Sequence, residues 1–154
     1  MRPRPQALRV YADADVLFRA ATASHAHTAA LVLLRTGEFT LVEVISAAYT
    51  VQEAANALRR YLPAQLPNLF QLITNTVRLV DDPPAAMLQT FQEQAHKKDV
   101  INLAAAVQAE AHLLVTYNGK DYFPQPGIMP IMTPGQFVLT VREVIWRNFD
   151  AGHN

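Results

Sequence analysis

The chain has 154 residues, the size of one domain, and 51% of them are hydrophobic, which excludes wholesale disorder. Its 13 Lys and Arg residues balance its 13 Asp and Glu residues, so no overall charge attracts nucleic acid or anionic membranes. The absence of cysteine excludes a disulfide scaffold, a thiolate zinc site and cysteine catalysis. No signal-peptide pattern follows the basic first residues and no apolar run of about 18 residues is present, so we expect a cytoplasmic protein without membrane contact.

Short segments rich in strand-forming residues alternate with segments whose apolar residues recur at helical spacing. The expected strands are residues 8–12, 39–45, 76–80, 112–116 and 128–132. The expected helices are residues 25–35, 50–61, 64–73, 85–96, 100–110 and 135–147, the last preceded by a Thr133 cap and Pro134 at its first position. This alternation predicts a three-layer α/β/α fold with a central parallel sheet of about five strands. We expect one domain over residues 1–154, with residues 1–6 and 148–154 as loose tails.

Acidic residues lie at the carboxyl ends of the predicted strands and at the starts of the helices. In an open parallel sheet, functional groups gather at this edge, near the point where the strand order reverses. The residues concerned are Asp13, Asp15, Glu53, Asp99 and Asp121. We therefore expect these side chains to converge on one cleft.

A cluster of carboxylates favours a bound cation, because the charges otherwise repel one another. Oxygen ligands without His or Cys suit Mg²⁺ or Mn²⁺ rather than zinc. Such a cation orients and deprotonates a water, which is the chemistry of phosphodiester hydrolysis. A structural interpretation stands beside this one: Asp99 caps its helix, and Asp13 and Asp15 are turn residues.

Five segments resemble, in order, the motifs of the PIN-domain nucleases, which include the VapC toxin ribonucleases of toxin–antitoxin systems. They are residues 10–17 with Asp13-Ala14-Asp15, 49–58 around Glu53, 98–106 opening on Asp99, 114–124 with Thr116, Asn118 and Asp121, and 132–137. The resemblance extends from about residue 8 to residue 146. It implies a PIN-type strand order and an Mg²⁺- or Mn²⁺-dependent endoribonuclease that hydrolyses RNA phosphodiester bonds.

The resemblance also implies a role for each matching residue. Asp13, Glu53, Asp99 and Asp121 are the expected catalytic residues: Asp13, Asp99 and Asp121 would hold Mg²⁺ or Mn²⁺, and Glu53 would assist the attacking water. Asp15, Thr116 and Asn118 are expected to hydrogen-bond within the site behind the metal ligands. Lys98 and Lys120 flank the acidic motifs and are therefore candidate contacts to substrate phosphates.

Asn118 departs from the family pattern, because many active members carry Asp directly after the fourth strand. Asp121 lies three residues later and can supply the missing carboxylate if a helical turn begins there. The alternative function is a non-catalytic PIN-like module that binds RNA or protein through a degenerate acidic site. The resemblance further implies a cognate antitoxin and a homodimer as partners. Tyr117 and Tyr122 fit either base stacking or packing.

Overall fold

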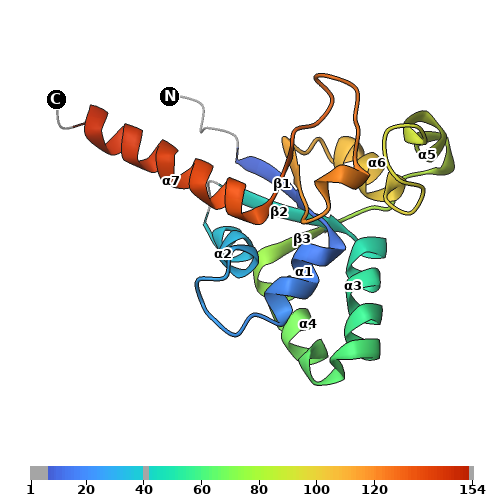
Figure 1. The fold of residues 1–154 in the computed structure, drawn as a ribbon, viewed down its shortest axis with the longest axis horizontal. Coiled ribbons are helices and arrows are strands. Elements are labelled where there is room, and N and C mark those ends of the chain that lie inside the picture. Colours follow the sequence, from blue (N-terminus) through green and yellow to red (C-terminus); the bar gives the residue numbers. More distant parts are fainter. Residues whose placement is uncertain (1–6, 40–41, 153–154) are drawn as a thin grey trace.

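The computed structural model describes residues 7–39 and 42–152. In this part of the chain five strands form one parallel sheet in the order β3-β2-β1-β4-β5 (Figure 1). The strands are β1 (Leu8–Ala12), β2 (Val42–Ala47), β3 (Val77–Val80), β4 (Leu113–Val115) and β5 (Ile131–Met132). The predicted fold class, a parallel five-stranded sheet covered by helices, is confirmed.

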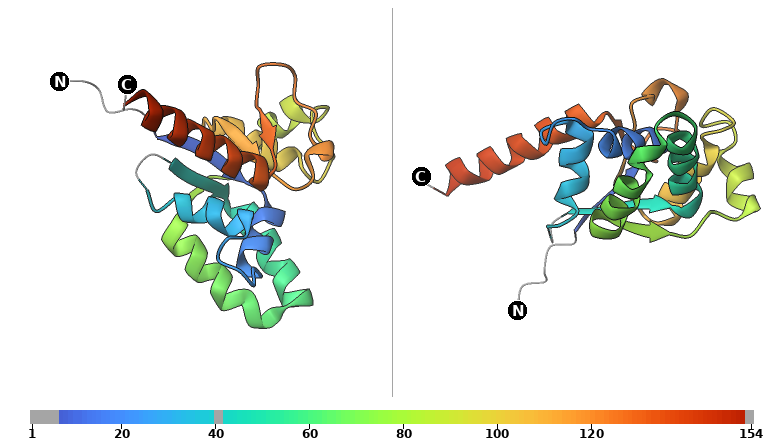
Figure 2. Two further views of the ribbon diagram at one scale, coloured as in Figure 1. Left: turned by 60° about the vertical axis from the view of Figure 1, so that its left-hand side comes forward. Right: turned by 90° about the horizontal axis from the view of Figure 1, so that it is seen from below.

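Helices cover both faces of the sheet (Figures 1 and 2). They are α1 (Ala14–Ala21), α2 (Ala29–Thr36), α3 (Ala48–Tyr61), α4 (Leu66–Thr76), α5 (Ala85–Phe91), α6 (Val100–Gln108) and α7 (Pro134–Ala151), with short 3₁₀ turns η1 (Pro63–Gln65) and η2 (Gly119–Asp121). One apolar core joins the sheet to α1, α2, α3, α4 and the start of α7. A second core joins the other face to α5 and α6.

Strand β1 lies at the centre of the sheet and contributes to both cores. Val10 and Ala12 face the first core, whereas Tyr11 between them faces the second, as the two-residue period of a strand requires. All three side chains are fully buried. Because β1 is buried on both faces, it fixes the position of Asp13, the residue that directly follows it.

Helix α1 is absent from the sequence-based prediction. It begins directly after Asp13, and its eight residues are too few for a clear helical period. The Asp13 side chain accepts a hydrogen bond from the Ala14 N–H, 2.7 Å away, and so caps the helix. This turn carries the chain from the buried strand onto the face that α1 covers.

Several predicted boundaries are wrong by a few residues. Strand β2 continues through Ser46 to Ala47, Thr76 ends α4 instead of opening β3, and α5 stops at Phe91. Residues 40–41 of the second predicted strand lie outside the described residues. The expected C-terminal tail is also wrong, because α7 continues to Ala151; residues 1–6 and 153–154 lie outside the described residues.

The predicted start of α7 is confirmed. Pro134 is its first residue, and the Thr133 hydroxyl accepts a hydrogen bond from the Gln136 N–H, 3.1 Å away. The Gln136 side-chain oxygen accepts in return from the Thr133 N–H at 2.9 Å, which completes a capping box. None of the helices in the described ranges is long and apolar enough to cross a membrane.

Candidate active site at the carboxyl edge of the sheet

The strand order reverses between β1 and β4, and the acidic residues gather at this point. From β1 the chain proceeds outward through β2 and β3 on one side, then returns to place β4 on the other side. Asp13 directly follows β1 and Thr116 directly follows β4. The Asp13 N–H donates to the Val115 carbonyl at 3.1 Å, which ties the two strand ends together. This edge is where open α/β sheets bind their ligands.

Asp13 is the centre of a hydrogen-bond network. Its Oδ1 accepts from the Ala14 N–H at 2.7 Å and from Asn102 Nδ2 at 3.1 Å. Its Oδ2 accepts from the Thr116 hydroxyl at 3.0 Å and from the Tyr122 hydroxyl at 2.7 Å. The side chain is 5% exposed, so these donors replace most of its contact with water.

Asp15 forms a second centre, two residues further along the chain. Its Oδ2 accepts from the Tyr117 N–H at 3.1 Å and from Asn118 Nδ2 at 2.9 Å. The Thr116 hydroxyl lies 3.1 Å from the same oxygen and also reaches Asp13, so it donates to one carboxylate at a time. The structure thus brings Asp15, Thr116 and Asn118 together behind Asp13. Asn118 presents its amide nitrogen to Asp15.

The carboxylates of the site are held in conditions that disfavour negative charge. Burial, and after it the charge of Asp13, raise the pKa of Asp15 and of Asp99 to about 6. Burial also raises the pKa of Asp13, against the opposing effect of its hydrogen bond from Tyr122. The pKa of Glu53 is raised by burial and then by Asp13. These acids are therefore close enough for their charges to act on one another.

Two carboxylate oxygens in this cluster have no hydrogen-bond partner. Among the described residues, Asp15 Oδ1 and Asp99 Oδ2 are buried side-chain oxygens without a donor. Asp99 is 7% exposed and stands at the first position before α6, yet its side chain makes no capping hydrogen bond. The interpretation of Asp99 as a simple helix cap is therefore wrong. An unpaired buried carboxylate oxygen is costly, which calls for a cation or a proton.

A hard divalent cation fits this donor set, which consists of carboxylate oxygens that repel one another. In residues 7–39 and 42–152, no three His, Cys, Asp or Glu side chains stand close enough to complete a metal site as they lie. Binding a cation therefore requires side chains to rotate. Glu53 is exposed on α3 and Asp121 is half-buried in η2, so both have room to do so. The assignment of Asp13, Asp99 and Asp121 as ligands remains a prediction.

Asp121 lies on the helical turn that its spacing from Asn118 predicts. The 3₁₀ turn η2 covers Gly119–Asp121, and the Asp121 N–H donates to the Asn118 carbonyl at 2.9 Å. The Asp121 carbonyl accepts from the His96 N–H at 2.7 Å, just before Asp99. The charge of Asp121 contributes to the raised pKa of Asp99, so the two acids are neighbours. Lys120 is exposed on the same turn.

Lys98 is the cation that acts on the cluster. Its charge lowers the pKa of Asp13, Glu53 and Asp99, which places it near all three. No ion pair joins its ammonium group to a carboxylate of the described residues. It therefore offers a positive charge beside the acids without neutralising any one of them.

A buried network under Asp13 has no counterpart among the sequence-based predictions. The Thr50 hydroxyl donates to Asn102 Oδ1, 2.5 Å away, and also lies 2.7 Å from the Tyr11 hydroxyl. Tyr11 accepts from the Ala47 N–H at 3.2 Å. Asn102 then donates to Asp13, so its amide is held in one orientation. The network connects the starts of α3 and α6 through the central strand.

The sequence holds one signal for this network, which is the spacing of Thr50 and Asn102 from the acidic residues. Thr50 precedes Glu53 by three residues in α3, and Asn102 follows Asp99 by three residues in α6. Residues three apart share a helix face. Each helix therefore turns one polar residue toward the buried network and one carboxylate toward the cluster.

For Tyr122 the structure decides between the two roles that the sequence left open, base stacking and packing. Its side chain is 6% exposed and its hydroxyl donates to Asp13, so it packs in the core and cannot stack on a base. Burial and the charge of Asp13 raise its pKa, which keeps the hydroxyl protonated and able to donate. Tyr117, by contrast, is 42% exposed.

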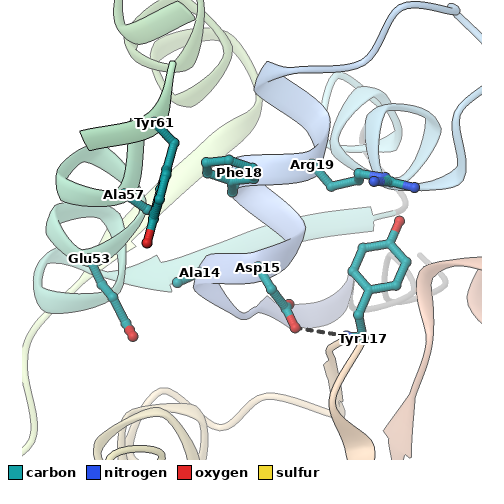
Figure 3. A pocket seen from close by; sticks show the side chains of 8 residues that line it. All are labelled: Ala14, Asp15, Phe18, Arg19, Glu53, Ala57, Tyr61 and Tyr117. Carbon is teal, nitrogen blue, oxygen red and sulfur yellow. Dashed lines mark hydrogen bonds between the residues drawn. The ribbon is translucent and has the colours of Figure 1, made fainter. Parts of the chain in front are cut away.

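An open cleft of about 520 Å³ adjoins the acidic cluster. Figure 3 shows the carboxylates of Glu53 and Asp15 at one edge of this cleft and the rings of Phe18, Tyr61 and Tyr117 around it. Arg19 lies beside Tyr117 in the same view. The cleft therefore combines an acidic edge with aromatic walls.

Comparison with known proteins places this architecture among solved structures. No protein-family model matches the sequence, and no curated protein matches it significantly. PAE2754 from Pyrobaculum aerophilum is similar with a TM-score of 0.61 and 16% identity, over 90% of this chain and 94% of that one. VapBC2 from Rickettsia felis, solved with a DNA fragment from its promoter, is similar with a TM-score of 0.58 and 12% identity, over 80% of this chain and 97% of that one.

VapC20 from Mycobacterium tuberculosis, a toxin that cleaves the sarcin-ricin loop, gives a TM-score of 0.52 and 12% identity, over 71% of this chain and 90% of that one. The chain has the PIN-domain fold of the VapC toxins. At these identities the likeness establishes the fold, and the residues of the site have to be argued from their own geometry.

Proposed function

We propose that the chain is an endoribonuclease that depends on Mg²⁺ or Mn²⁺ and acts as the toxin of a toxin–antitoxin pair. The observation that carries this proposal is the pair of unpartnered buried oxygens, on Asp15 and Asp99, beside Asp13 at the switch point of the sheet. A fold built to be stable would not leave such oxygens unpaired. The fold supports the same proposal, because the solved structures similar to this chain include VapC20, a toxin that cleaves the sarcin-ricin loop.

Asp13, Asp99 and Asp121 would hold the cation through their carboxylate oxygens. A divalent cation, when bound, lowers the pKa of a water and offsets charge on the phosphate. Glu53 accepts the proton of the attacking water at a carboxylate oxygen, a role that its raised pKa and its position at the open edge of the cleft favour. Lys98 and Lys120 hold the phosphates on either side.

The carboxylates are held in their orientations by hydrogen bonds among Asp15, Thr116 and Asn118. Asn118 and the Tyr117 N–H hold Asp15 Oδ2, and the Thr116 hydroxyl connects Asp15 to Asp13. A residue that orients the groups around a ligand contributes as much to a site as direct contact does. We infer that Asn118 serves here as a donor and that its missing carboxylate is supplied by Asp121.

The proposed partner protein is an antitoxin, because VapBC2 is a complex of this kind. An antitoxin side chain bearing a cation would find the unpartnered carboxylates of the cleft a favourable site. We also propose a homodimer. Size-exclusion chromatography with light scattering tests the homodimer, and a monomer mass would reject it.

A non-catalytic module that binds RNA or protein is the second candidate. Two observations favour it: Asp13 already accepts four hydrogen bonds, and no three acids of the described residues stand within reach of one cation as they lie. Such a module binds its partner without Mg²⁺ or Mn²⁺. Metal dependence therefore separates the two functions.

The test is cleavage of a mixed-sequence RNA in Mn²⁺, in Mg²⁺ and in EDTA. We expect cutting with either metal, none in EDTA, and none for Asp13→Asn purified in the same way. Asp81→Asn, an exposed acid beyond β3, is the matched control and should cut as the wild type does. Cutting in EDTA, or by Asp13→Asn, would contradict the proposal.

A further inference from the structure

Helix α3 carries a row of residues that passes the acidic cluster. Tyr49, Glu53, Ala57 and Tyr61 recur every four residues, so each lies next to the following one, and the row slants around the helix by about 120° from Tyr49 to Tyr61. Glu53, Ala57 and Tyr61 line the cleft of about 520 Å³ described above. Tyr49 lines a second hollow, of about 590 Å³. The row therefore connects two hollows, with Glu53 between their tyrosines.

The tyrosines of this row are exposed to solvent. Tyr49 is 46% and Tyr61 is 64% exposed, and Tyr117 on the far wall of the first hollow is 42% exposed. Single exposed rings are common on protein surfaces, but these three border the two hollows beside the carboxylates. The guanidinium of Arg60 lies 5.2 Å from the centroid of the Tyr61 ring, which fixes that ring by a cation–π contact.

Positive charges line both hollows. Lys97 and Lys98 line the second hollow with Tyr49, and Arg19 lines the first, beside Tyr117 on the wall opposite Tyr61 (Figure 3). None of the three forms an ion pair with a carboxylate in the described ranges. Each hollow therefore combines an exposed ring with a cation, and Glu53 lies between the two tyrosines of α3. This combination suits a chain with a negative backbone and flat bases.

The length of the row sets the size of what it can hold. At a rise of 1.5 Å per residue, Tyr49 and Tyr61 lie about 18 Å apart along the helix axis. A short unpaired stretch of a few nucleotides spans such a distance. A base pair inside a duplex hides its faces against its neighbours, so stacking on these rings requires unpaired bases.

We propose that this slanting row on α3 is the track that holds the RNA substrate, with one base stacked on Tyr49 and another on Tyr61, on opposite sides of the phosphate at Glu53. The proposal rests on the ribonuclease function proposed above. It assigns Tyr49 and Tyr61 to substrate binding and leaves bond cleavage to the carboxylates. Each hollow carries a cation as well as an exposed aromatic ring, and this pairing favours an RNA strand over a protein segment.

The test measures binding apart from cleavage. A short fluorescein-labelled oligoribonucleotide of mixed sequence is titrated with protein in EDTA, and its fluorescence anisotropy gives the Kd. We expect Tyr49→Leu and Tyr61→Leu each to weaken RNA binding about 10-fold or more, the scale of one stacked base. Tyr61→Trp keeps an aromatic ring at this position and should bind RNA as tightly as the wild type does. Phe70→Leu, an equally exposed ring on α4 that lines neither hollow, should bind as the wild type does.

Cleavage kinetics in Mn²⁺ supply the second readout. The two leucine variants should raise KM by the same factor and leave kcat within about twofold, because they touch no reacting group. Equal Kd values for both leucine variants and the wild type would overturn the track even if the wild type cuts RNA. Binding lost as expected in a protein that cuts nothing would support the track and reject the nuclease. Wild-type protein that binds no RNA but captures a protein through Tyr61 would overturn the track in favour of a protein partner.

Discussion

Replacing Asp99 by Asn should make the protein more stable at neutral pH. The raised pKa of Asp99, about 6 against an ordinary value of 3.8, means that folding disfavours its charged form. A tenfold change in an acid dissociation constant corresponds to about 1.4 kcal/mol, so the charge lowers the free energy of unfolding by at most about 3 kcal/mol. Solvent at the open edge of the cluster screens part of this repulsion, which leaves about 2 kcal/mol. Asn has nearly the same shape and carries no charge, so the variant escapes this penalty.

The sign of the pH dependence follows from the direction in which the pKa moves. Because the folded-state pKa is the higher one, the penalty is complete above about pH 6 and fades as the pH falls toward 3.8. We expect Asp99→Asn to gain about 2 kcal/mol near pH 7.5 and less than about 1 kcal/mol near pH 4.

Urea unfolding in EDTA at the two pH values measures this gain, with Asp81→Asn as a matched control that should change stability by less than about 0.5 kcal/mol. A structural cap predicts a different outcome, since Asn caps a helix as well as Asp does and stability would be unchanged at both pH values. An unchanged or lower stability near pH 7.5 would refute the argument from burial and charge. Loss of cleavage in the same variant would show that the site trades stability for function.

Three further substitutions test the contacts around the site and the fold, each by urea unfolding. Asn102→Leu should lower the free energy of unfolding by about 3 kcal/mol, since it removes one buried hydrogen-bond partner from Asp13 and one from Thr50; a neutral effect would show the network to be dispensable. Tyr122→Phe should cost about 2 kcal/mol by removing a hydrogen bond to a carboxylate, and should reduce cleavage; wild-type rates would contradict its role in orienting Asp13. Thr133→Ala should cost about 1 kcal/mol through the capping box of α7 and leave cleavage unchanged, and altered cleavage would contradict a purely local role.

The layers of the fold and the acidic edge could be predicted from the sequence because both depend on local patterns. Alternating apolar strands and helical stripes predict the parallel sheet, and Thr133 with Pro134 predicts the start of α7. The acids follow strands or open helices, so topology alone brings them to one edge. Helix α1 was missed because its eight residues are too few for a clear helical period and it begins directly after Asp13, at the end of β1.

The buried network could not be predicted, because its partners are distant in the sequence. Tyr11 lies 39 residues from Thr50 and 91 residues from Asn102, and the spacing of Thr50 and Asn102 from the acids does not show that the three side chains meet. The same holds for Tyr122, whose hydroxyl meets Asp13 across 109 residues. The role of Asn118 could not be predicted from the sequence either, because a side-chain amide can accept through its oxygen or donate through its nitrogen. The structure turns the nitrogen toward Asp15.

The claim that the carboxylate cluster is a divalent-cation site is tested most directly by Mn²⁺ binding, measured by electron paramagnetic resonance on the metal-free protein. We predict one tight Mn²⁺ site in the wild type and in Asp81→Asn, and its loss or strong weakening in Asp99→Asn and Asp13→Asn. Wild-type Mn²⁺ binding by the Asp99 and Asp13 variants, or no binding by the wild type, would contradict the account.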